Sequence, residues 1–232
     1  MANTYGVPVR TREIQNYFID ELLHENFTVD KTGAKTIELI GASFIADASS
    51  IFGKPNYEYI TAELNWYAMQ STNINDIYGG DKEPPQAWQF AADEHGNINS
   101  NYGTLIYSDQ FNNQYDQVFH ELVNHPDSRR ASMIYQRPSI WNEYNKGNMS
   151  DFICTNAVTY YIRDRKLHCV VQMRSNDVVF GYKNDFAWQH HVLKELFARL
   201  TRDSMVDIED VGDICWQVQN LHVYERHFDL VK

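Results

Sequence analysis

The stretch Met149–Asp185, MSDFICTNAVTYYIRDRKLHCVVQMRSNDVVFGYKND, contains the features that decide the fold and the chemistry of this chain. It places Cys154 at the entrance to a predicted strand, and a second predicted strand ends in Arg174-Ser175-Asn176-Asp177. An acidic residue, Asp185, comes just before a predicted helix. One hairpin can therefore gather a nucleophile, an anion-binding group and a polar group that reads a base.

Length and composition predict a single globular domain over residues 1–232. The chain is 43% hydrophobic and 14% aromatic, which is enough for one substantial core. No apolar run approaches the roughly 20 residues needed to cross a bilayer, and the N-terminal MANTYGVPVRTREI has no apolar core after its charges. We therefore expect a cytoplasmic protein that is neither exported nor inserted into a membrane.

Cysteine content and charge exclude several classes of site. Cys154, Cys169 and Cys215 are too few and too scattered for a disulfide framework, and no Cys/His spacing indicates a metal site. The formal charge of −11 argues against a broad nucleic-acid surface, which needs clustered Lys and Arg. A small anion can still bind where a few cations converge.

The pattern of helices and strands predicts an α+β domain, because no regular βαβ order and no glycine-rich phosphate loop is present. Apolar spacing predicts helices and strands in turn. The expected helices are Thr11–Asn26, Tyr57–Gln70 with Asn56 as its cap, Asn112–His125 and Phe186–Leu200; the expected strands include one through Ile37, Leu39 and Ile40, the hairpin above, and a last strand over 214–228.

Cys154 is the candidate nucleophile because it follows the polar loop NKGNMSD, where a chain usually passes from the surface into a sheet. A free thiol with a pKa of about 8.5 is mostly protonated at neutral pH, so a nucleophile needs a nearby cation such as Arg174. The alternative is a buried, unreactive thiol. Cys169 fits that alternative, since it alternates with Leu167 and Val171 on one face of a strand.

Other polar residues have both a functional and a structural interpretation. The end of the second strand, Arg174 to Asp177, can bind an anion or simply face solvent. His222 and Tyr224 alternate on one face of the last strand, so they either bind a ligand or form a buried hydrogen-bonded pair. Glu63 falls beside the apolar stripe of its helix and is expected to be half buried. Asp185 either reads a base or caps the helix that follows.

Loops supply further candidates. Arg129-Arg130 forms a predicted exposed basic turn, and Lys31 lies on a predicted loop beside a strand; each is a cation for an anionic ligand or a solvated side chain. Residues 71–101 are rich in Asn, Asp, Gly and Pro, which predicts surface loops of the kind that carry binding groups. Trp88 and Tyr102 are the aromatic candidates in and beside this region.

Seven segments, spread over nearly the whole chain, resemble signature blocks of the thymidylate synthase superfamily in the same order. Within that superfamily they resemble most the deoxycytidylate (dCMP) hydroxymethylases of T-even bacteriophages. The resemblance implies a thymidylate-synthase-like α+β fold with a mixed β-sheet flanked by helices, one sheet face forming a homodimer interface. The segments are DKTGAKTIELIGASF, AELNWY, NSNYG, HPDSRRASMIY, SDFICTN, MRSNDVVFGYKND and NLHVYERHF.

The resemblance also implies a nucleotide site. Arg129 and Arg130 match the arginine pair that reaches the phosphate across the dimer interface, and His222 and Tyr224 match the pair that binds the sugar 3′-hydroxyl. Asp177 falls near the folate, where Trp88 and Tyr102 are expected as well. The residues expected at the nucleotide are Lys31, Arg129, Arg130, Arg174, Ser175, Asn176, His222 and Tyr224.

The implied reaction is transfer of a one-carbon unit from 5,10-methylenetetrahydrofolate to C5 of a pyrimidine. Cys154 matches the nucleophile that adds to C6, and Glu63 matches the glutamate that organises water and proton transfers. Thymidylate synthases have asparagine at the position of Asp185. Because cytosine presents an amine at C4 and an unprotonated N3, a carboxyl group at that position favours dCMP over dUMP.

Two departures from the superfamily leave alternatives open. The chain reads Ile153-Cys154-Thr155 where thymidylate synthases have Pro-Cys-His, and only eight residues follow Tyr224, where relatives have a C-terminal segment that closes over the folate. Either the sequence is trimmed or closure is achieved differently. The alternatives to a dCMP hydroxymethylase, which would act in the host cytoplasm if phage-encoded, are a thymidylate synthase, a dUMP or CMP hydroxymethylase, and a weakly active nucleotide-binding subunit of a precursor-synthesising complex.

Overall fold

Contacts divide the chain into two compact units in a computed structural model that describes residues 9–29 and 33–232. Residues up to Pro55 together with Tyr160–Lys232 form the sheet unit, and Asn56–Thr159 form the helical unit. Strand β4 (Thr155–Arg163) begins in the helical unit and continues into the sheet unit. That the whole chain forms one domain stays a prediction.

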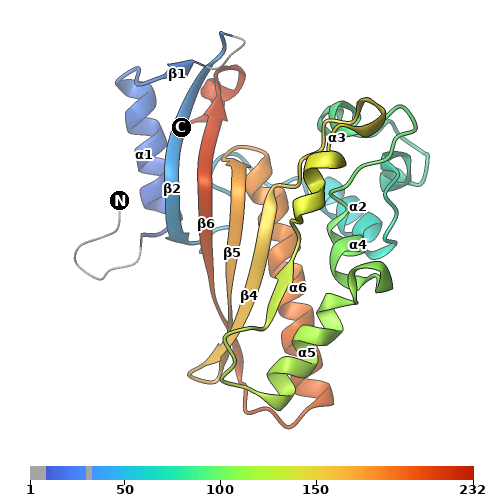
Figure 1. Cartoon of the computed structure of the whole chain (residues 1–232). Helices are drawn as coiled ribbons and strands as arrows, with labels where there is room; N and C mark the ends of the chain where they lie inside the picture. The colour runs from blue at the N-terminus through green and yellow to red at the C-terminus, as the bar shows by residue number, and fades with distance from the viewer. Residues whose placement is uncertain (1–8, 30–32) are drawn as a thin grey trace. The chain divides into compact units, whose positions relative to one another are not determined.

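A mixed sheet forms the centre of the sheet unit (Figure 1). Strand β1 (Thr28–Val29) pairs antiparallel with β2 (Lys35–Ile45), and β2 pairs antiparallel with β6 (Asp210–Tyr224). Strand β5 (Lys166–Asp177) pairs with β6 in parallel. The last strand thus ends at Tyr224, four residues before the predicted Phe228, because the chain turns there into the 3₁₀ helix η5 (Glu225–Leu230).

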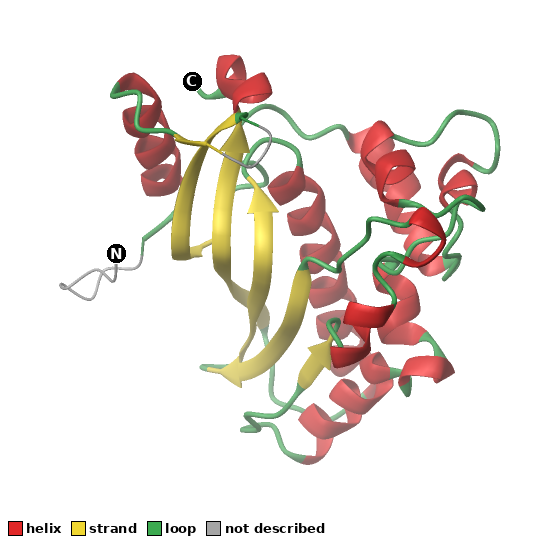
Figure 2. Ribbon diagram, turned by 45° about the horizontal axis from the view of Figure 1, so that its top comes forward, coloured by secondary structure: helices red, strands yellow, loops and turns green. Residues whose placement is uncertain are grey.

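Helix α6 (Gly181–Asp203) connects the parallel strands β5 and β6, as a crossover must. It is the long helix that lies behind the strands in Figure 2. The ring of Tyr182, in the first turn of the helix, packs against Phe44 and Trp216, with ring centroids 6.0 Å and 5.2 Å apart. The helix begins five residues before the predicted Phe186. The prediction used the apolar spacing from Phe186 onward, whereas the ring contacts of Tyr182 extend the buried face of the helix back toward Gly181.

The hairpin predicted at the centre of the sequence is present. Strand β4 is followed by Asp164 and Arg165, whose φ angles of 50° and 58° suit a two-residue hairpin turn. On β5, the predicted alternation is confirmed, since Leu167, Cys169, Val171 and Met173 are each no more than 1% exposed. Burial raises the pKa of Cys169 well above its usual range, so this thiol is unreactive, as predicted.

Helix α1 (Thr11–Leu23) packs beside β2 in the sheet unit, where the Tyr17 hydroxyl donates to the Glu38 carbonyl at 3.1 Å. The helix ends three residues earlier than the predicted Asn26. No helix within 9–29 and 33–232 is both long and apolar enough to cross a membrane.

The helical unit is built from short helices. Asn56 caps α2 as predicted, because its Oδ1 accepts the Tyr59 N–H at 3.2 Å. The antiparallel pair of β3 with β4 forms its only described ladder of named strands. Its elements are α2 (Tyr57–Ala68), η1 (Ile74–Tyr78), α3 (Gln86–Ala91), α4 (Tyr102–Tyr107), η2 (Asp109–Phe111), α5 (Gln114–Asn124), β3 (Ser132–Ile134), η3 (Pro138–Asn142) and η4 (Lys146–Asn148).

Aromatic rings fill the core of the helical unit. Tyr67 stacks on Tyr102 with ring centroids 5.5 Å apart, and Tyr102 meets Tyr135 edge-on with ring centroids 5.2 Å apart. Helix α4 approaches α2 so closely that a Cβ on Gly103 would lie 1.7 Å from the Tyr67 carbonyl oxygen, so only glycine fits there. The prediction that residues 71–101 are surface loops is therefore only partly right, since Ile74, Ile77 and Ile98 are buried.

Neighbouring positions on α6 test the packing of the sheet unit. Leu193 is fully buried, whereas Lys194 beside it is exposed. We expect Leu193→Ala to lower the free energy of unfolding by about 2–5 kcal/mol, because the lost side chain leaves a cavity. Lys194→Ala is the control, with an expected change below about 0.5 kcal/mol. Urea denaturation measures both, and equal values would contradict the packing described above.

Candidate active site

The end of β5 lies against α6 through Asn176 and Asp185 in the sheet unit. Asn176 is 4% exposed, and its Nδ2 donates to Asp185 Oδ2 at 2.7 Å. The indole N–H of Trp216, on β6, donates to Asn176 Oδ1 at 3.3 Å. Because an indole nitrogen can only donate, the amide of Asn176 must face Trp216 with its oxygen and Asp185 with its nitrogen. The orientation of the Asp185 carboxylate is therefore set by a chain of hydrogen bonds.

Asp185 is not the N-cap of α6. It lies inside α6, which begins at Gly181. Asp177 supplies the capping group instead: its Oδ1 accepts backbone N–H groups of Val179 at 3.0 Å, Phe180 at 2.6 Å and Gly181 at 3.3 Å. The second carboxylate oxygen of Asp177 is buried and has no hydrogen-bond partner among the residues described.

Lys183 is a buried cation that the sequence did not single out. It is 7% exposed, and its Nζ lies 4.5 Å from the centre of the Phe180 ring. Burial lowers the pKa of Lys183, and the negative charge of Asp177 opposes that shift. Lysine is seldom buried, so nothing in the local sequence indicates this placement.

His222 and Tyr224 project from the end of β6 beside these groups. Asp177 pairs with His222 in the parallel ladder. The ring centroids of His222 and Tyr224 lie 4.9 Å apart in an edge-on contact, which confirms that these two side chains point the same way. Burial is the main reason that the pKa of His222 is lowered; Asp177 opposes the shift and Arg174 adds to it. The imidazole is therefore neutral at pH 7, which suits a hydrogen bond to a hydroxyl.

Arg174 and Ser175 precede Asn176 on β5, and both are half buried. Ser175 pairs with Asn220 in the ladder with β6. The sheet unit thus places the predicted residues from Arg174 to Asp177 beside His222 in the register of two parallel strands. Lys31, the other predicted phosphate ligand on this part of the chain, lies outside the described residues.

Cys154 lies in the helical unit, directly before β4, and is half buried. Both neighbours of Cys154 are held by long-range hydrogen bonds. Gln136 Nε2 donates to the Ile153 carbonyl at 2.9 Å, and the Thr155 hydroxyl bonds the Tyr102 hydroxyl at 3.0 Å. The predicted position at the entrance to a strand is correct, and the residues on both sides of the thiol are hydrogen-bonded to distant parts of the chain.

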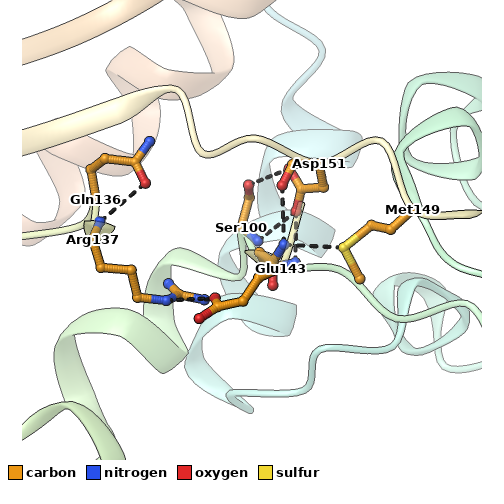
Figure 3. A network of polar contacts seen from close by, with 7 residues as sticks. Ser100, Gln136, Arg137, Glu143, Met149 and Asp151 are labelled. Atoms are coloured by element: carbon orange, nitrogen blue, oxygen red, sulfur yellow. Dashed lines mark hydrogen bonds and ion pairs between the residues drawn. The ribbon is translucent and has the colours of Figure 1, made fainter. Parts of the chain in front are cut away.

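Asp151 anchors the loop that leads to Cys154, as Figure 3 shows. Its Oδ2 accepts the backbone N–H of Asn99 at 2.7 Å and of Ser100 at 2.8 Å, and its Oδ1 accepts the Ser100 hydroxyl at 2.5 Å. Asp151 is 7% exposed. A buried carboxylate with three donors holds the loop to a segment some 50 residues away.

Figure 3 also shows an ion pair between Arg137 and Glu143. Arg137 Nε donates to Glu143 Oε2 at 2.8 Å, and the two side chains are 22% and 27% exposed (Figure 3). Gln136, next to Arg137, is the residue that holds the Ile153 carbonyl. The sequence did not single out Gln136, Arg137 or Asp151; Gln136 and Asp151 act through partners distant along the chain.

Glu63 is more deeply buried than predicted. It is 5% exposed rather than half buried, and its Oε1 accepts a short hydrogen bond from the Tyr59 hydroxyl. The indole N–H of Trp88 donates to that hydroxyl at 2.9 Å. Burial raises the pKa of Glu63 to about 7, although the hydrogen bonds from Tyr59 and Trp88 act in the opposite direction. This carboxyl group can therefore both accept and release a proton near neutral pH.

The remaining predicted residues have different surroundings. Arg129 and Arg130 lie on an exposed turn, as predicted, and Arg130 Nε bonds Glu121 Oε1 at 2.8 Å. Trp88 is half buried on α3, and its ring meets Trp66 edge-on at 5.3 Å. Tyr102 is only 4% exposed and supports Thr155. Contact of Trp88 and Tyr102 with a folate stays a prediction.

A family model described as thymidylate synthase matches residues 17–232, so the chain belongs to the thymidylate synthase family. The protein is thus an enzyme of the class that transfers a one-carbon unit to a pyrimidine nucleotide, and the predicted family is confirmed. Its relatives include the deoxycytidylate 5-hydroxymethyltransferases of Enterobacteria phages T4 and T6. Each is 53% identical over 210 residues, which cover 90% of this chain and 84% of the relative.

More distant relatives share the fold. The thymidylate synthase of Bacillus subtilis subsp. natto is 27% identical over 215 residues, covering 88% of this chain and 71% of that protein. The solved structure of thermostable thymidylate synthase A from Bacillus subtilis superposes with a TM-score of 0.68 at 24% identity, covering 94% of this chain and 81% of the other. The predicted thymidylate-synthase-like fold is confirmed.

Asp151 offers a test of how the loop before Cys154 is held. We expect Asp151→Ala to lower the free energy of unfolding by about 2–4 kcal/mol, because two N–H groups and one hydroxyl lose a buried acceptor. Asp109→Ala, which removes an exposed carboxylate of the same unit, should change it by less than about 0.5 kcal/mol. Urea denaturation measures both, and an equally small loss for Asp151→Ala would show that the loop does not need this anchor.

Proposed function

We propose that this protein is a deoxycytidylate 5-hydroxymethyltransferase, which adds a hydroxymethyl group to C5 of dCMP. The observation that carries the proposal is the carboxylate of Asp185, held by Asn176 at 2.7 Å, at the position where thymidylate synthases have asparagine. The 53% identity to the phage T4 enzyme of that name supports the same choice of substrate.

Asp185 accounts for the choice of base. The exocyclic amine of cytosine donates hydrogen bonds and N3 is unprotonated, so a carboxylate can accept from the amine and stabilise a proton arriving at N3. Uracil has a carbonyl oxygen at C4 and a proton on N3, so the same carboxylate would face an acceptor at C4. Asn176 Nδ2 donates to Oδ2 of this carboxylate and thereby holds its orientation.

Cys154 is proposed as the nucleophile. Its thiolate adds to C6 of the pyrimidine, which turns C5 into a nucleophilic, enamine-like carbon. When bound, 5,10-methylenetetrahydrofolate supplies the one-carbon unit that C5 captures. Water then adds to the exocyclic methylene at C5 and the thiolate leaves C6, so the sum is dCMP, methylenetetrahydrofolate and water giving hydroxymethyl-dCMP and tetrahydrofolate. Glu63, with a pKa of about 7, is the proposed acid and base for the proton transfers.

Asp177 is the residue best suited to the folate. Its Oδ2 is buried and has no hydrogen-bond partner in the described part of the chain, whereas Oδ1 is occupied by three backbone N–H groups. A buried acceptor without a donor is costly, and the N–H groups of a pterin would satisfy it. Trp88 and Tyr102 are the proposed aromatic neighbours.

The phosphate site is proposed to need two subunits. Arg174, Ser175 and Lys31 belong to one subunit, while Arg129 and Arg130 reach the phosphate of its partner in a homodimer that packs through the sheet. Their exposed turn is compatible with that role. A few guanidinium groups focused on one phosphate can outweigh the net charge of −11. His222 and Tyr224 are proposed to bind the sugar 3′-hydroxyl, and the cytoplasm of the host cell is the proposed site of action.

The product identifies the reaction. Purified protein is incubated with methylenetetrahydrofolate and either dCMP or dUMP, and the nucleotide is weighed by mass spectrometry. We expect a hydroxymethyl adduct on dCMP and little on dUMP. Cys154→Ser should abolish turnover and largely spare nucleotide binding. A methylated product, or formation of dihydrofolate, would indicate a thymidylate synthase, and dCMP binding without turnover would indicate a nucleotide-binding subunit.

Asp185→Asn tests the base-reading residue. The ratio of kcat/KM for dCMP to that for dUMP should fall by about 10- to 100-fold, because the amide can donate to O4 of uracil and loses an acceptor for the cytosine amine. Asp203→Asn, the same chemical change at an exposed position in the last turn of α6, should leave the ratio unchanged. An unchanged ratio in Asp185→Asn would remove this residue from base selection.

A further inference from the structure

Tyr59 lies one helical turn before Glu63 on α2, so both side chains project from the same face. The Tyr59 hydroxyl donates to Glu63 Oε1. Glu63 has no ion pair among residues 9–29 and 33–232, so this neutral hydroxyl is the group that the buried carboxyl group meets in place of a cation. A buried carboxylate without a cation depends on such donors for its charged form.

The direction of this hydrogen-bond chain follows from the chemistry of its members. Trp88 Nε1 lies 2.9 Å from the Tyr59 oxygen and can only donate, so it occupies an acceptor lone pair of Tyr59. Ionised Glu63 can only accept, so the single hydroxyl proton of Tyr59 points to its carboxylate. Trp88 is itself held by its edge-on contact with Trp66, which is fully buried. The chain from Trp88 through Tyr59 to the ionised carboxylate of Glu63 therefore has one orientation.

We propose that Tyr59 is a positioning residue that holds Oε1 of Glu63, so that protons of the reaction are exchanged at Oε2. The inference rests on the proposed function, because it assigns Glu63 the acid and base role. A donor fixed on Oε1 stops the carboxyl group from rotating, and it leaves one oxygen for water or substrate. Burial raises the pKa of Tyr59 well above its usual range, and the charge of Glu63 adds to this, so Tyr59 keeps its proton and remains a donor.

The balance of two opposing effects on Glu63 gives the proposal a measurable consequence. Burial favours the neutral acid, whereas the hydrogen bonds from Tyr59 and, to a smaller extent, Trp88 favour the carboxylate. Removing the hydroxyl while keeping the ring should therefore raise the pKa of Glu63. A hydrogen bond to a charged acceptor is large enough to shift the titration midpoint upward by about one pH unit.

Titration of Glu63 in the whole protein tests the inference without relying on catalysis. Glutamate labelled with ¹³C at the side-chain carboxyl is followed by NMR, and Glu63→Gln identifies the Glu63 signal. In Tyr59→Phe the midpoint should rise by about one pH unit. Tyr57→Phe is the matched control, because it removes a hydroxyl from a tyrosine that is 70% exposed on the same helix, and its midpoint should not move.

The pH dependence of kcat/KM with dCMP is the second measurement. The limb controlled by Glu63 should move upward in Tyr59→Phe by the same amount as the NMR midpoint, with a smaller movement in Trp88→Phe, where Tyr59 remains. A loss of activity that is equal at every pH would mean that Tyr59 only supports the fold and would overturn the proposal, as would an unmoved NMR midpoint. Absence of turnover in the unmodified protein would instead overturn the proposed function and leave the NMR result readable.

Discussion

The parallel pairing of β5 with β6 is the constraint on which the sheet unit depends. Parallel neighbours cannot be joined by a tight turn, so the chain must leave the end of β5, cross the sheet as α6 and return. The start of α6 is thereby brought against the strand that precedes it. Asn176 meets Asp185, and Asp177 pairs with His222, because of this crossover. The position of Asp185, the proposed base-reading residue, is thus a consequence of the sheet topology.

Three carboxyl or carboxylate groups show how different surroundings assign different tasks. Asp151 is surrounded by three donors and acts as an anchor for the loop before Cys154. Asp177 uses one oxygen to start α6 and keeps the other without a partner within the described ranges. Glu63 has burial and the hydroxyl of Tyr59, and its pKa of about 7 suits proton transfer. The chemistry of each follows from the number of donors that face it.

Within the thymidylate synthase family, the chemistry proposed here divides between positions of two kinds. Cys154 and Glu63 are proposed to serve one-carbon transfer whichever pyrimidine is used, whereas Asp185 is proposed to select the base. The carboxylate needs support that an amide would not, because a charge at a partly buried position is costly unless donors face it. Asn176, oriented by Trp216, is such a donor.

Local pattern alone determined much of this protein: the alternation of β5, the capped helix α2, the hairpin turn and the cysteine at the start of β4 each depend on neighbours a few residues apart. The resemblance of whole blocks determined the family and the proposed roles. Only the tertiary structure decided that α6 begins at Gly181, that Glu63 is buried rather than half buried, and that Asp151 and Tyr59 support the residues beside them. The physical reason is that burial and hydrogen bonding depend on partners distant in the chain, as Trp216 is from Asn176. Contacts between such partners leave no local pattern in a single sequence.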